Sequence, residues 1–237
     1  MTRITTLADP EAVAVRAARD IAGQLQRAIE QRGRAHLALS GGGTPERTYQ
    51  LLVDAVEDWG TVEVWFADER CVGPQDEQSN YRMAAQTLLD RLASPPRAIH
   101  RMRGELGPQE GARRYAQELR ASFDGPESDV PALDLIVLGI GPDGHVASLF
   151  PGAPTLAADK HDLCLAVHDS PKPPSERITL SLAVLRAANR CLLLATGPSK
   201  ADAVSAAMGE PTKHVPASLL RRERLTMILD DMAAPAR

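Results

Sequence analysis

Residues 133–152 read LDLIVLGIGPDGHVASLFPG and contain the clearest strand signal in the chain. Leu135–Leu138 are consecutive apolar residues, which is typical of a parallel strand that is covered on both faces. A glycine-rich turn follows at once and carries Asp143 and His145. Because α/β proteins bind ligands outside the carboxyl ends of their strands, we predict that this turn holds part of a functional site.

The spacing Gly139-x-Gly141-x-x-Gly144 also matches the fingerprint of dinucleotide-binding proteins. That fingerprint requires a full helix after the turn, because the amino terminus of the helix holds the pyrophosphate. Here only residues 146–150 have room to be helical before Pro151, which would interrupt a helix. A full crossover helix therefore does not follow directly, and the glycine pattern alone is a weak signal.

His145 has two interpretations, one structural and one catalytic. A histidine in a loop often only fills a polar gap. However, His145 stands two residues after Asp143, and residues two apart in extended backbone point to the same side. Asp143 would then orient the imidazole and fix its tautomer, which a general base requires. We therefore favour the catalytic role.

Strands and helices alternate along the whole chain. Strands are predicted at 35–39, 62–67, 135–138, 163–167, 190–196 and 225–229, and helices at 10–31, 46–56, 79–92 and 108–123. Residues 94–107 and 124–131 are predicted as irregular connections, and the tail from Pro235 as frayed. No repeat or linker interrupts this order. The prediction is a single domain, residues 1–237, of the α/β class, with a mostly parallel twisted sheet and helices on both faces.

Composition excludes several classes of function. The formal net charge is -4, which gives no general attraction for nucleic acid or an anionic membrane. No apolar run approaches the length of a membrane span, and residues 1–9 lack the features of a signal peptide, so a cytoplasmic location is expected. The 3 cysteines are far apart, which argues against a disulfide framework, and the 6 histidines show no metal-ligand spacing.

A second informative stretch is Ser40–Pro45, which reads SGGGTP and follows the first predicted strand. Thr44 is placed to cap a helix whose first residue is Pro45. Bare backbone amides and the positive end of the helix dipole would together form an anion site. The loop does not end in the GK[ST] of a Walker loop, and it does not match the GxSxG motif of a nucleophile elbow. The alternative is an ordinary tight connection, but adjacent glycines cost more entropy than a simple turn requires.

Two further strand ends carry charged residues. Asp68, Glu69 and Arg70 follow one strand and form either a solvated rim or part of the same site. Lys200 stands in the first turn of a helix, where a cation opposes the helix dipole unless an anion is bound. The proline-rich residues 168–176 are predicted as a flexible loop that could cover the site.

Five segments, taken in order, resemble the 6-phosphogluconolactonase family. They read LALSGGGTPERTY, WFADERCVGPQDEQSNYRMA, LDLIVLGIGPDGHVASLFPG, RITLSLAVLRAA and LLLATGPSKADAV, and span about residues 36–205. The same superfamily includes glucosamine-6-phosphate deaminase. The resemblance implies a deaminase/lactonase-like, Rossmann-type α/β domain. It also implies hydrolysis of 6-phospho-D-glucono-1,5-lactone to 6-phospho-D-gluconate, in the oxidative pentose phosphate pathway, without a cofactor or a metal.

The resemblance assigns roles to individual residues. His145 would activate water for attack on the lactone carbonyl, and Asp143 would orient His145. Arg70 would stabilise the oxyanion or position the lactone, while Asp68 and Glu69 would shape the pocket. The residues expected to bind substrate and phosphate are Ser40, Gly41, Gly42, Gly43, Thr44, Asp68, Arg177 and Lys200. The expected partner is the sugar-phosphate lactone alone, with no nucleic acid or membrane, and the chain is expected to be a monomer or a weak homo-oligomer.

Two rival functions differ from this resemblance at identifiable positions. Deaminases carry a glutamate shortly after the DGH turn, where residues 146–150 of this chain contain no acid. They also lack an arginine at the position of Arg70. A sugar-phosphate sensor of a transcription regulator would carry a DNA-binding module ahead of the domain, and residues 1–31 hold only one predicted helix.

Overall fold

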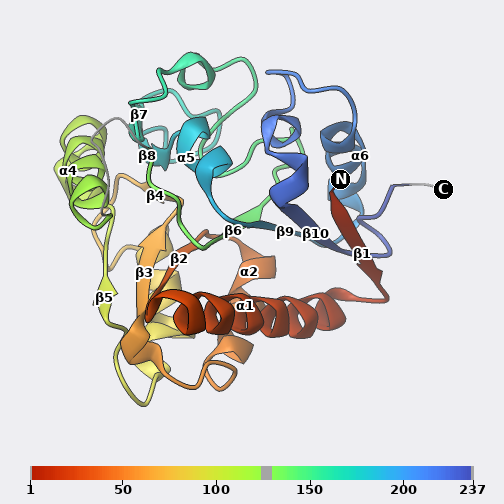
Figure 1. Cartoon of the computed structure of the whole chain (residues 1–237). Coiled ribbons are helices and arrows are strands. Elements are labelled where there is room, and N and C mark those ends of the chain that lie inside the picture. The colour runs from red at the N-terminus through yellow and green to blue at the C-terminus, as the bar shows by residue number, and fades with distance from the viewer. Residues whose placement is uncertain (1, 124–129, 236–237) are drawn as a thin grey trace.

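A computed structural model gives the fold of this protein and describes residues 2–123 and 130–235 (Figure 1). Within these residues the larger sheet has seven strands, all parallel, in the order β1-β10-β9-β6-β2-β3-β5. These strands are β1 (Arg3–Leu7), β2 (Ala35–Leu39), β3 (Val62–Phe66), β5 (Ala98–Ile99), β6 (Leu135–Gly139), β9 (Cys191–Ala195) and β10 (Leu225–Asp230). From β2 the chain winds to β3 and β5, and from β6 it winds the other way to β9 and β10. A ligand crevice is expected where the winding reverses, between β2 and β6.

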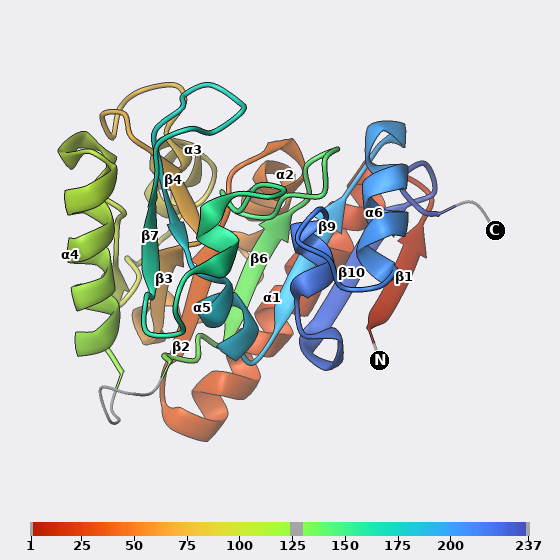
Figure 2. The ribbon, with the colours of Figure 1, turned by 90° about the horizontal axis from the view of Figure 1, so that it is seen from above.

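Helices cover both faces of the larger sheet, as Figures 1 and 2 show from two directions. The α-helices are α1 (Pro10–Arg32), α2 (Gly43–Leu52), α3 (Asn80–Thr87), α4 (Pro108–Ala121), α5 (Leu182–Ala187) and α6 (Ala201–Met208). Short 3-10 helices occur at Trp59–Thr61, Leu89–Arg91, Gly104–Leu106, Pro154–Ala157, Pro198–Lys200, Pro216–Leu219 and Arg222–Arg224. Helices α1 and α2 pack together on one face, α5 and α6 lie on the other, and α4 packs against a smaller sheet.

The central strands and α1 form the core for reasons visible in the sequence. Every residue of β2, β3, β9 and β10 is buried, as expected for apolar strands covered on both faces. Helix α1 begins where the Asp9 side chain accepts a hydrogen bond from the amide of Ala12. It ends at Gly33, whose φ of 71° gives the left-handed cap. Its buried side chains, such as Ile21 and Leu25, recur at helical spacing.

A smaller antiparallel sheet was not predicted. Within the described residues it has three strands, in the order β4-β8-β7, which are β4 (Asp68–Arg70), β8 (Arg177–Leu180) and β7 (Cys164–Val167). Strand β4 follows β3 almost directly and pairs with β8 instead of continuing the larger sheet. This pairing sets Arg70 opposite Arg177, so the smaller sheet brings two arginines from distant parts of the chain together.

Most predicted elements are confirmed, with four corrections in addition to the smaller sheet. The structure adds β1 and β5, which were not predicted, and ends the helices predicted at 46–56 and 79–92 earlier, at Leu52 and Thr87. Strand β1 was missed because it lies at the sheet edge, where its residues are mostly exposed and do not form an apolar run. Of the connection predicted at 124–131, residues 124–129 lie outside the described residues, as do residues 236–237 of the tail.

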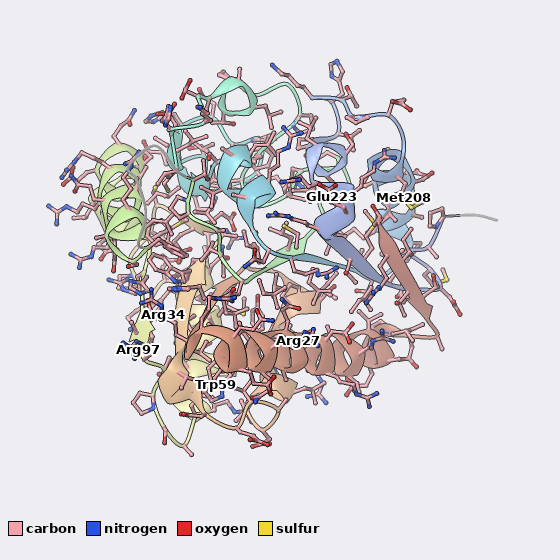
Figure 3. All side chains as sticks on the ribbon, in the orientation of Figure 1. Arg27, Arg34, Trp59, Arg97, Met208 and Glu223 are labelled. Atoms are coloured by element: carbon pink, nitrogen blue, oxygen red, sulfur yellow. The ribbon has the colours of Figure 1, made fainter. Side chains whose placement is uncertain are left out.

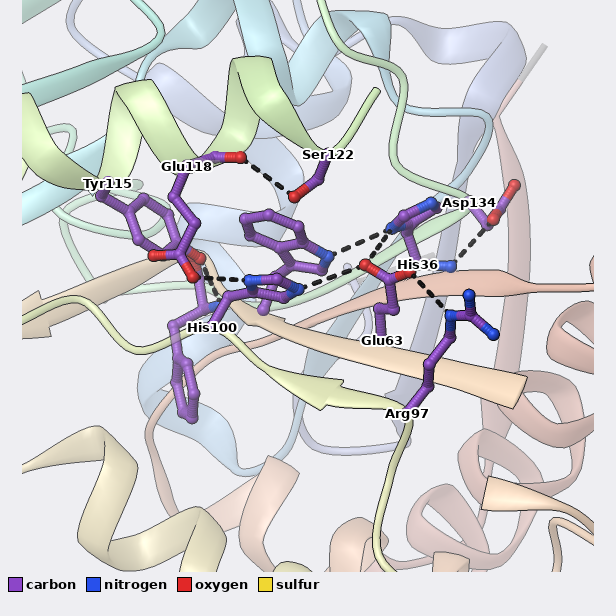
Figure 4. Close-up of polar contacts among 10 residues, drawn as sticks. His36, Glu63, Arg97, His100, Tyr115, Glu118, Ser122 and Asp134 are labelled. Carbon is purple, nitrogen blue, oxygen red and sulfur yellow. Dashed lines mark hydrogen bonds and ion pairs between the residues drawn. The ribbon is translucent and has the colours of Figure 1, made fainter. Parts of the chain in front are cut away.

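A cluster of polar side chains is buried toward the amino-terminal edge of the larger sheet, between β3 and α4 (Figure 4). His100 Nδ1 lies 2.7 Å from Glu118 Oε1, and His100 Nε2 lies 3.2 Å from Glu63 Oε2. The His100 ring stacks on Trp65 with centroids 3.7 Å apart. Trp65 Nε1 donates to His36 Nδ1 at 3.2 Å, so His36 accepts here as a neutral imidazole. Burial also lowers the pKa of His36, against the opposing charge of Glu63.

Candidate active site

A cavity of about 340 Å³ opens at the carboxyl-terminal edge of the larger sheet, beside the point where the winding reverses. The predicted site residues that line it are Ser40, Gly41, Gly42, Gly43, Thr44, Asp68, Arg70, His145, Arg177 and Lys200. Asp143 joins this set through its contact with His145. The structure therefore brings these residues together from five separate segments of the chain, but the expectation that Glu69 shapes the pocket is wrong, because Glu69 does not line the cavity.

The glycine loop turns directly into α2. Gly42 has a φ of 115°, which residues with side chains rarely adopt, and this turn lets the helix begin at Gly43. The prediction that Thr44 caps the helix is wrong: the cap position is Gly42, and the Thr44 hydroxyl lies 2.7 Å from the Thr196 hydroxyl. The Ser40 hydroxyl donates to the carbonyl of Val137 at 2.7 Å and so ties the loop to β6. The free amides at the start of α2 remain available to an anion.

His145 and Asp143 form the closest polar pair at the cavity. Nδ1 of His145 lies 2.5 Å from Oδ1 of Asp143. Burial lowers the pKa of His145, although the hydrogen bond and charge of Asp143 oppose that effect. Burial acts to raise the pKa of Asp143, but the hydrogen bond and charge of His145 outweigh it and leave the pKa lowered. Asp143 is thus a carboxylate that accepts from Nδ1–H, which leaves the Nε2 lone pair of a neutral His145 free.

The backbone around His145 is fixed by short turns. The amide of Gly141 donates to the carbonyl of His145 at 2.9 Å, and the amide of Gly144 donates to the carbonyl of Gly141 at 2.9 Å. The amide of Ala217 donates to the carbonyl of Gly144 at 3.0 Å and ties the turn to the 3-10 helix Pro216–Leu219. The His145 ring also contacts Phe150, with centroids 4.8 Å apart. The imidazole therefore has a defined orientation without a ligand.

Asp68 and Glu69 have different roles, although they are adjacent. Buried Asp68 lines the cavity and accepts from Ser148 Oγ at 2.7 Å and Asn80 Nδ2 at 3.2 Å. Glu69 points away from the cavity lining and accepts from the amides of Asn80 and Tyr81, at the start of α3. Burial raises the pKa of Glu69, and these amide hydrogen bonds oppose the rise. Glu69 is therefore a helix-capping residue, and only Asp68 faces the site.

Arg70 retains a donor for a ligand. Its Nη1 donates to the carbonyl of Gln78 at 2.6 Å, but its buried Nε has no hydrogen-bond partner among the described residues. A buried donor without an acceptor costs about 1–3 kcal/mol. Because Nε is shielded from solvent, an oxygen atom in the cavity could accept from it only after the side chain turned, and the role expected for Arg70 is supported by its place in the cavity lining.

Arg177 anchors the proline-rich loop at the cavity. The side chain is buried and donates to the carbonyls of Lys172, Pro173 and Pro174 at 3.1–3.3 Å. The prediction that residues 168–176 could cover the site is supported to this extent: Lys172 and Pro173 line the cavity. Arg177 therefore positions the loop as well as lining the site.

Two lysines contribute positive charge. Lys200 ends the 3-10 turn Pro198–Lys200 and holds the cap position of α6, so it precedes the helix in which it was predicted. Burial lowers the pKa of Lys200, and the charge of Lys172 lowers it further. Lys172 Nζ lies 3.7 Å from Asp143 Oδ1. Two lysines close enough to affect one another would both be stabilised by an anion in the cavity.

Sequence reasoning did not find Lys172, Asn80 or Ser148. Lys172 belongs to the loop that was predicted to cover the site, and its charge within an otherwise uncharged SPKPPS run was an available signal. Asn80 and Ser148 contact Asp68, which lies in the smaller sheet, and Ser148 belongs to the turn after His145. These contacts depend on the tertiary fold, so no sequence pattern predicted them.

No helix among the described residues is both long enough and apolar enough to span a lipid bilayer. No group of three or more His, Cys, Asp or Glu side chains in the described part is arranged to hold a metal ion.

A parallel α/β sheet with a glycine loop before a helix and a His–Asp pair, both beside the point of reversed winding, is typical of α/β proteins that bind small molecules. Residues 8–229 match the model of the family described as glucosamine-6-phosphate isomerases/6-phosphogluconolactonase. The chain belongs to this family.

The similarity to individual relatives extends over nearly the whole length of both chains. It is 38% identical to the 6-phosphogluconolactonase of Streptomyces coelicolor, over 95% of this chain and 91% of that protein. It is 34% identical to that of Mycobacterium tuberculosis, over 95% and 94%. The crystal structure of a 6-phosphogluconolactonase from Shewanella baltica superposes with a TM-score of 0.81 at 30% identity, over 97% of both chains.

Proposed function

We propose that this protein hydrolyses 6-phospho-D-glucono-1,5-lactone to 6-phospho-D-gluconate, a reaction of the oxidative pentose phosphate pathway. The observation that carries the proposal is the oriented His145–Asp143 pair at a cavity that also holds an anion loop and Lys200. Relatives named 6-phosphogluconolactonase, at 34–38% identity over 95% of the chain, support the substrate. A cytoplasmic location and a monomeric or weakly associated state complete the proposal.

The proposed reaction follows from the donors and acceptors at the cavity. Nε2 of His145 takes a proton from water, and the resulting hydroxide attacks the lactone carbonyl. Arg70 donates to the oxyanion of the tetrahedral intermediate. The intermediate collapses with cleavage of the bond between C1 and the ring oxygen, and that oxygen takes the proton from His145. Asp143 stabilises the imidazolium throughout. No covalent nucleophile is needed, because a lactone is already an activated ester.

Phosphate binding is assigned to the glycine loop and the cationic side chains that line the cavity. The amides of Gly41–Thr44 supply oriented donors, and Lys200 and Arg177 supply charge. Lys172 is added to this set because it lines the same cavity and lies near Lys200. Binding the phosphate at a fixed distance from His145 would position the carbonyl, and such positioning is a large part of catalysis by a single base.

A direct assay tests this function. The lactone is generated in place by oxidation of glucose 6-phosphate, and its loss is compared with spontaneous hydrolysis, with and without the protein. Faster loss that disappears in a His145→Ala variant supports both the reaction and the base. Glucosamine 6-phosphate is run in parallel, and ammonia release instead of lactone loss would favour the deaminase. Apart from Asp143, which is paired with His145, Asp68 carries the only carboxylate among the described residues at the cavity, which disfavours that outcome.

A further inference from the structure

A second cavity, of about 320 Å³, lies at the opposite, amino-terminal edge of the larger sheet, between α1 and strands β1, β10, β9 and β6. It is almost as large as the candidate active site, and both fall in the range of small-molecule sites. Four arginines line it, and they are Arg3, Arg19, Arg27 and Arg190. We call them the cavity arginines. Nothing in the proposed reaction uses this cavity.

The strand register gathers two of the cavity arginines on one face of the sheet. Arg3 pairs with Thr226, and Thr226 pairs with Leu192, so these three residues lie side by side across β1, β10 and β9. Arg190 precedes Leu192 by two residues and therefore points to the same side. The two remaining cavity arginines come from α1, two helical turns apart, and Arg27 is labelled in Figure 3.

The charge in the second cavity is unbalanced. Its only carboxylate among the described residues is Asp20, which already accepts from Arg16 Nε at 3.0 and 3.1 Å. None of the cavity arginines forms an ion pair with a described residue. The acceptors of Arg27 and Arg190 are the neutral oxygens of Gln24, at 2.9 Å, and Thr226, at 3.5 Å. Four converging guanidinium groups repel one another unless an anion lies between them.

We propose that the second cavity binds a small anion that carries a phosphate group. Guanidinium groups present paired N–H donors that match phosphate oxygens, and several together suit a group of charge -2 better than a single carboxylate. The cavity is concave, and its floor includes Leu135 and Leu192, so it can also cover an apolar part of an organic phosphate. A long polyanion is disfavoured, because the whole chain carries a net charge of -4.

This site is separate from the candidate active site. Strand β6 contributes Leu135 to the second cavity and Gly139 to the first, and β9 contributes Leu192 and Ala195 in the same way. Four residues of strand span about 13 Å, so one small molecule cannot occupy both cavities. The proposal does not depend on the lactonase reaction.

Isothermal titration with inorganic pyrophosphate tests the proposal in the full chain. The key variant is Arg19→Gln/Arg190→Gln, and the matched control is Arg113→Gln/Arg114→Gln, which removes two charges from the exposed face of α4. Lys200→Ala reports binding in the candidate active site. AMP and glucose 6-phosphate are titrated separately, because a nucleoside or sugar part would fill the apolar floor differently. Arg19→Gln alone, at an exposed position, guards against misfolding of the double variant.

The expected result is pyrophosphate affinity that falls at least tenfold in Arg19→Gln/Arg190→Gln, and measurably in Arg19→Gln, but is kept in the control and in Lys200→Ala. Tighter binding of AMP or glucose 6-phosphate that depends on the same arginines would support the proposal and identify the organic part. Three results would overturn it: loss of binding only in Lys200→Ala, equal weakening in the key and control variants, or no binding in the wild type.

Discussion

Gly141 lies directly against the imidazole of His145: a Cβ atom on Gly141 would stand 2.0 Å from Nδ1 of His145 and 2.4 Å from Oδ1 of Asp143. A methyl group therefore cannot fit while the two side chains keep their contact. We expect Gly141→Ala to displace the His145–Asp143 pair and to lower kcat about 100-fold or more, the contribution typical of a general base. Lactone hydrolysis by the purified variant measures this.

The matched control for that substitution is Gly73→Ala. Gly73 lies outside the cavity lining, and a Cβ atom there would meet nothing within 4 Å. Both substitutions add one methyl group to a loop, so only the contact with His145 distinguishes them. Equal activities of the two variants would remove His145 and Asp143 from the catalytic role.

Activity should fall as the solution becomes acid. Burial lowers the pKa of His145 below its usual 6.5, against the effect of Asp143, and the base acts only when it is neutral. A lowered pKa keeps His145 neutral to lower pH, so kcat/KM should decline only below pH 6.5. In Asp143→Asn the opposing effect is lost, so the midpoint should move to still lower pH while the plateau rate falls. A pH profile of both proteins, corrected for spontaneous hydrolysis, checks this, and a flat profile would contradict it.

The position of the site was predictable because it depends on local sequence. A buried strand followed by glycines, an acid and an imidazole marks the carboxyl end of β6, and SGGGTP marks that of β2. Parallel strands bring such ends together whatever their order, so the convergence of Ser40–Thr44 with His145 follows without knowledge of the topology.

The smaller sheet and the details of the loops were not predictable in the same way. Strand β4 has only three residues, all charged, and forms because its backbone pairs with β8 more than a hundred residues later. The contacts of Arg177 with three carbonyls of its loop also depend on that pairing. The predicted cap of α2 was Thr44, but the observed cap is Gly42, because a glycine with a positive φ can begin the helix without a side-chain acceptor.

The two candidate phosphate ligands should respond differently to substitution. Lys200→Ala removes a cation that has no structural hydrogen bond among the described residues, so we expect the KM and the Kd for 6-phosphogluconate to rise about 10–100-fold with little change in kcat. Arg177→Ala also releases the loop at Lys172, so kcat and thermal stability should fall together with affinity. The control is Lys213→Ala at an exposed position outside the cavity. Binding of the product that is unchanged in both variants would contradict the assignment.

Stability should depend on His100 at the opposite end of the sheet. His100→Leu removes the partner of buried Glu63 and of Glu118, and we expect the free energy of unfolding to fall by about 3 kcal/mol. Arg113→Ala breaks an exposed pair on α4 and should cost about 1 kcal/mol or less. Urea denaturation measures both, and lactonase activity should stay unchanged because His100 does not line the cavity.

The double variant His100→Leu/Glu63→Leu distinguishes two causes of lost stability: the loss of the contact between His100 and Glu63, and the burial of the Glu63 charge without His100. In His100→Leu, Glu63 keeps Arg97, at 3.4 Å, and His36 Nδ1, at 3.7 Å, beside a newly apolar neighbour. Replacing Glu63 as well removes the buried charge, so the double variant should recover part of the stability that the single variant loses. Losses that simply add would mean that the two side chains act independently, and that the short contacts of His100 contribute little to the fold.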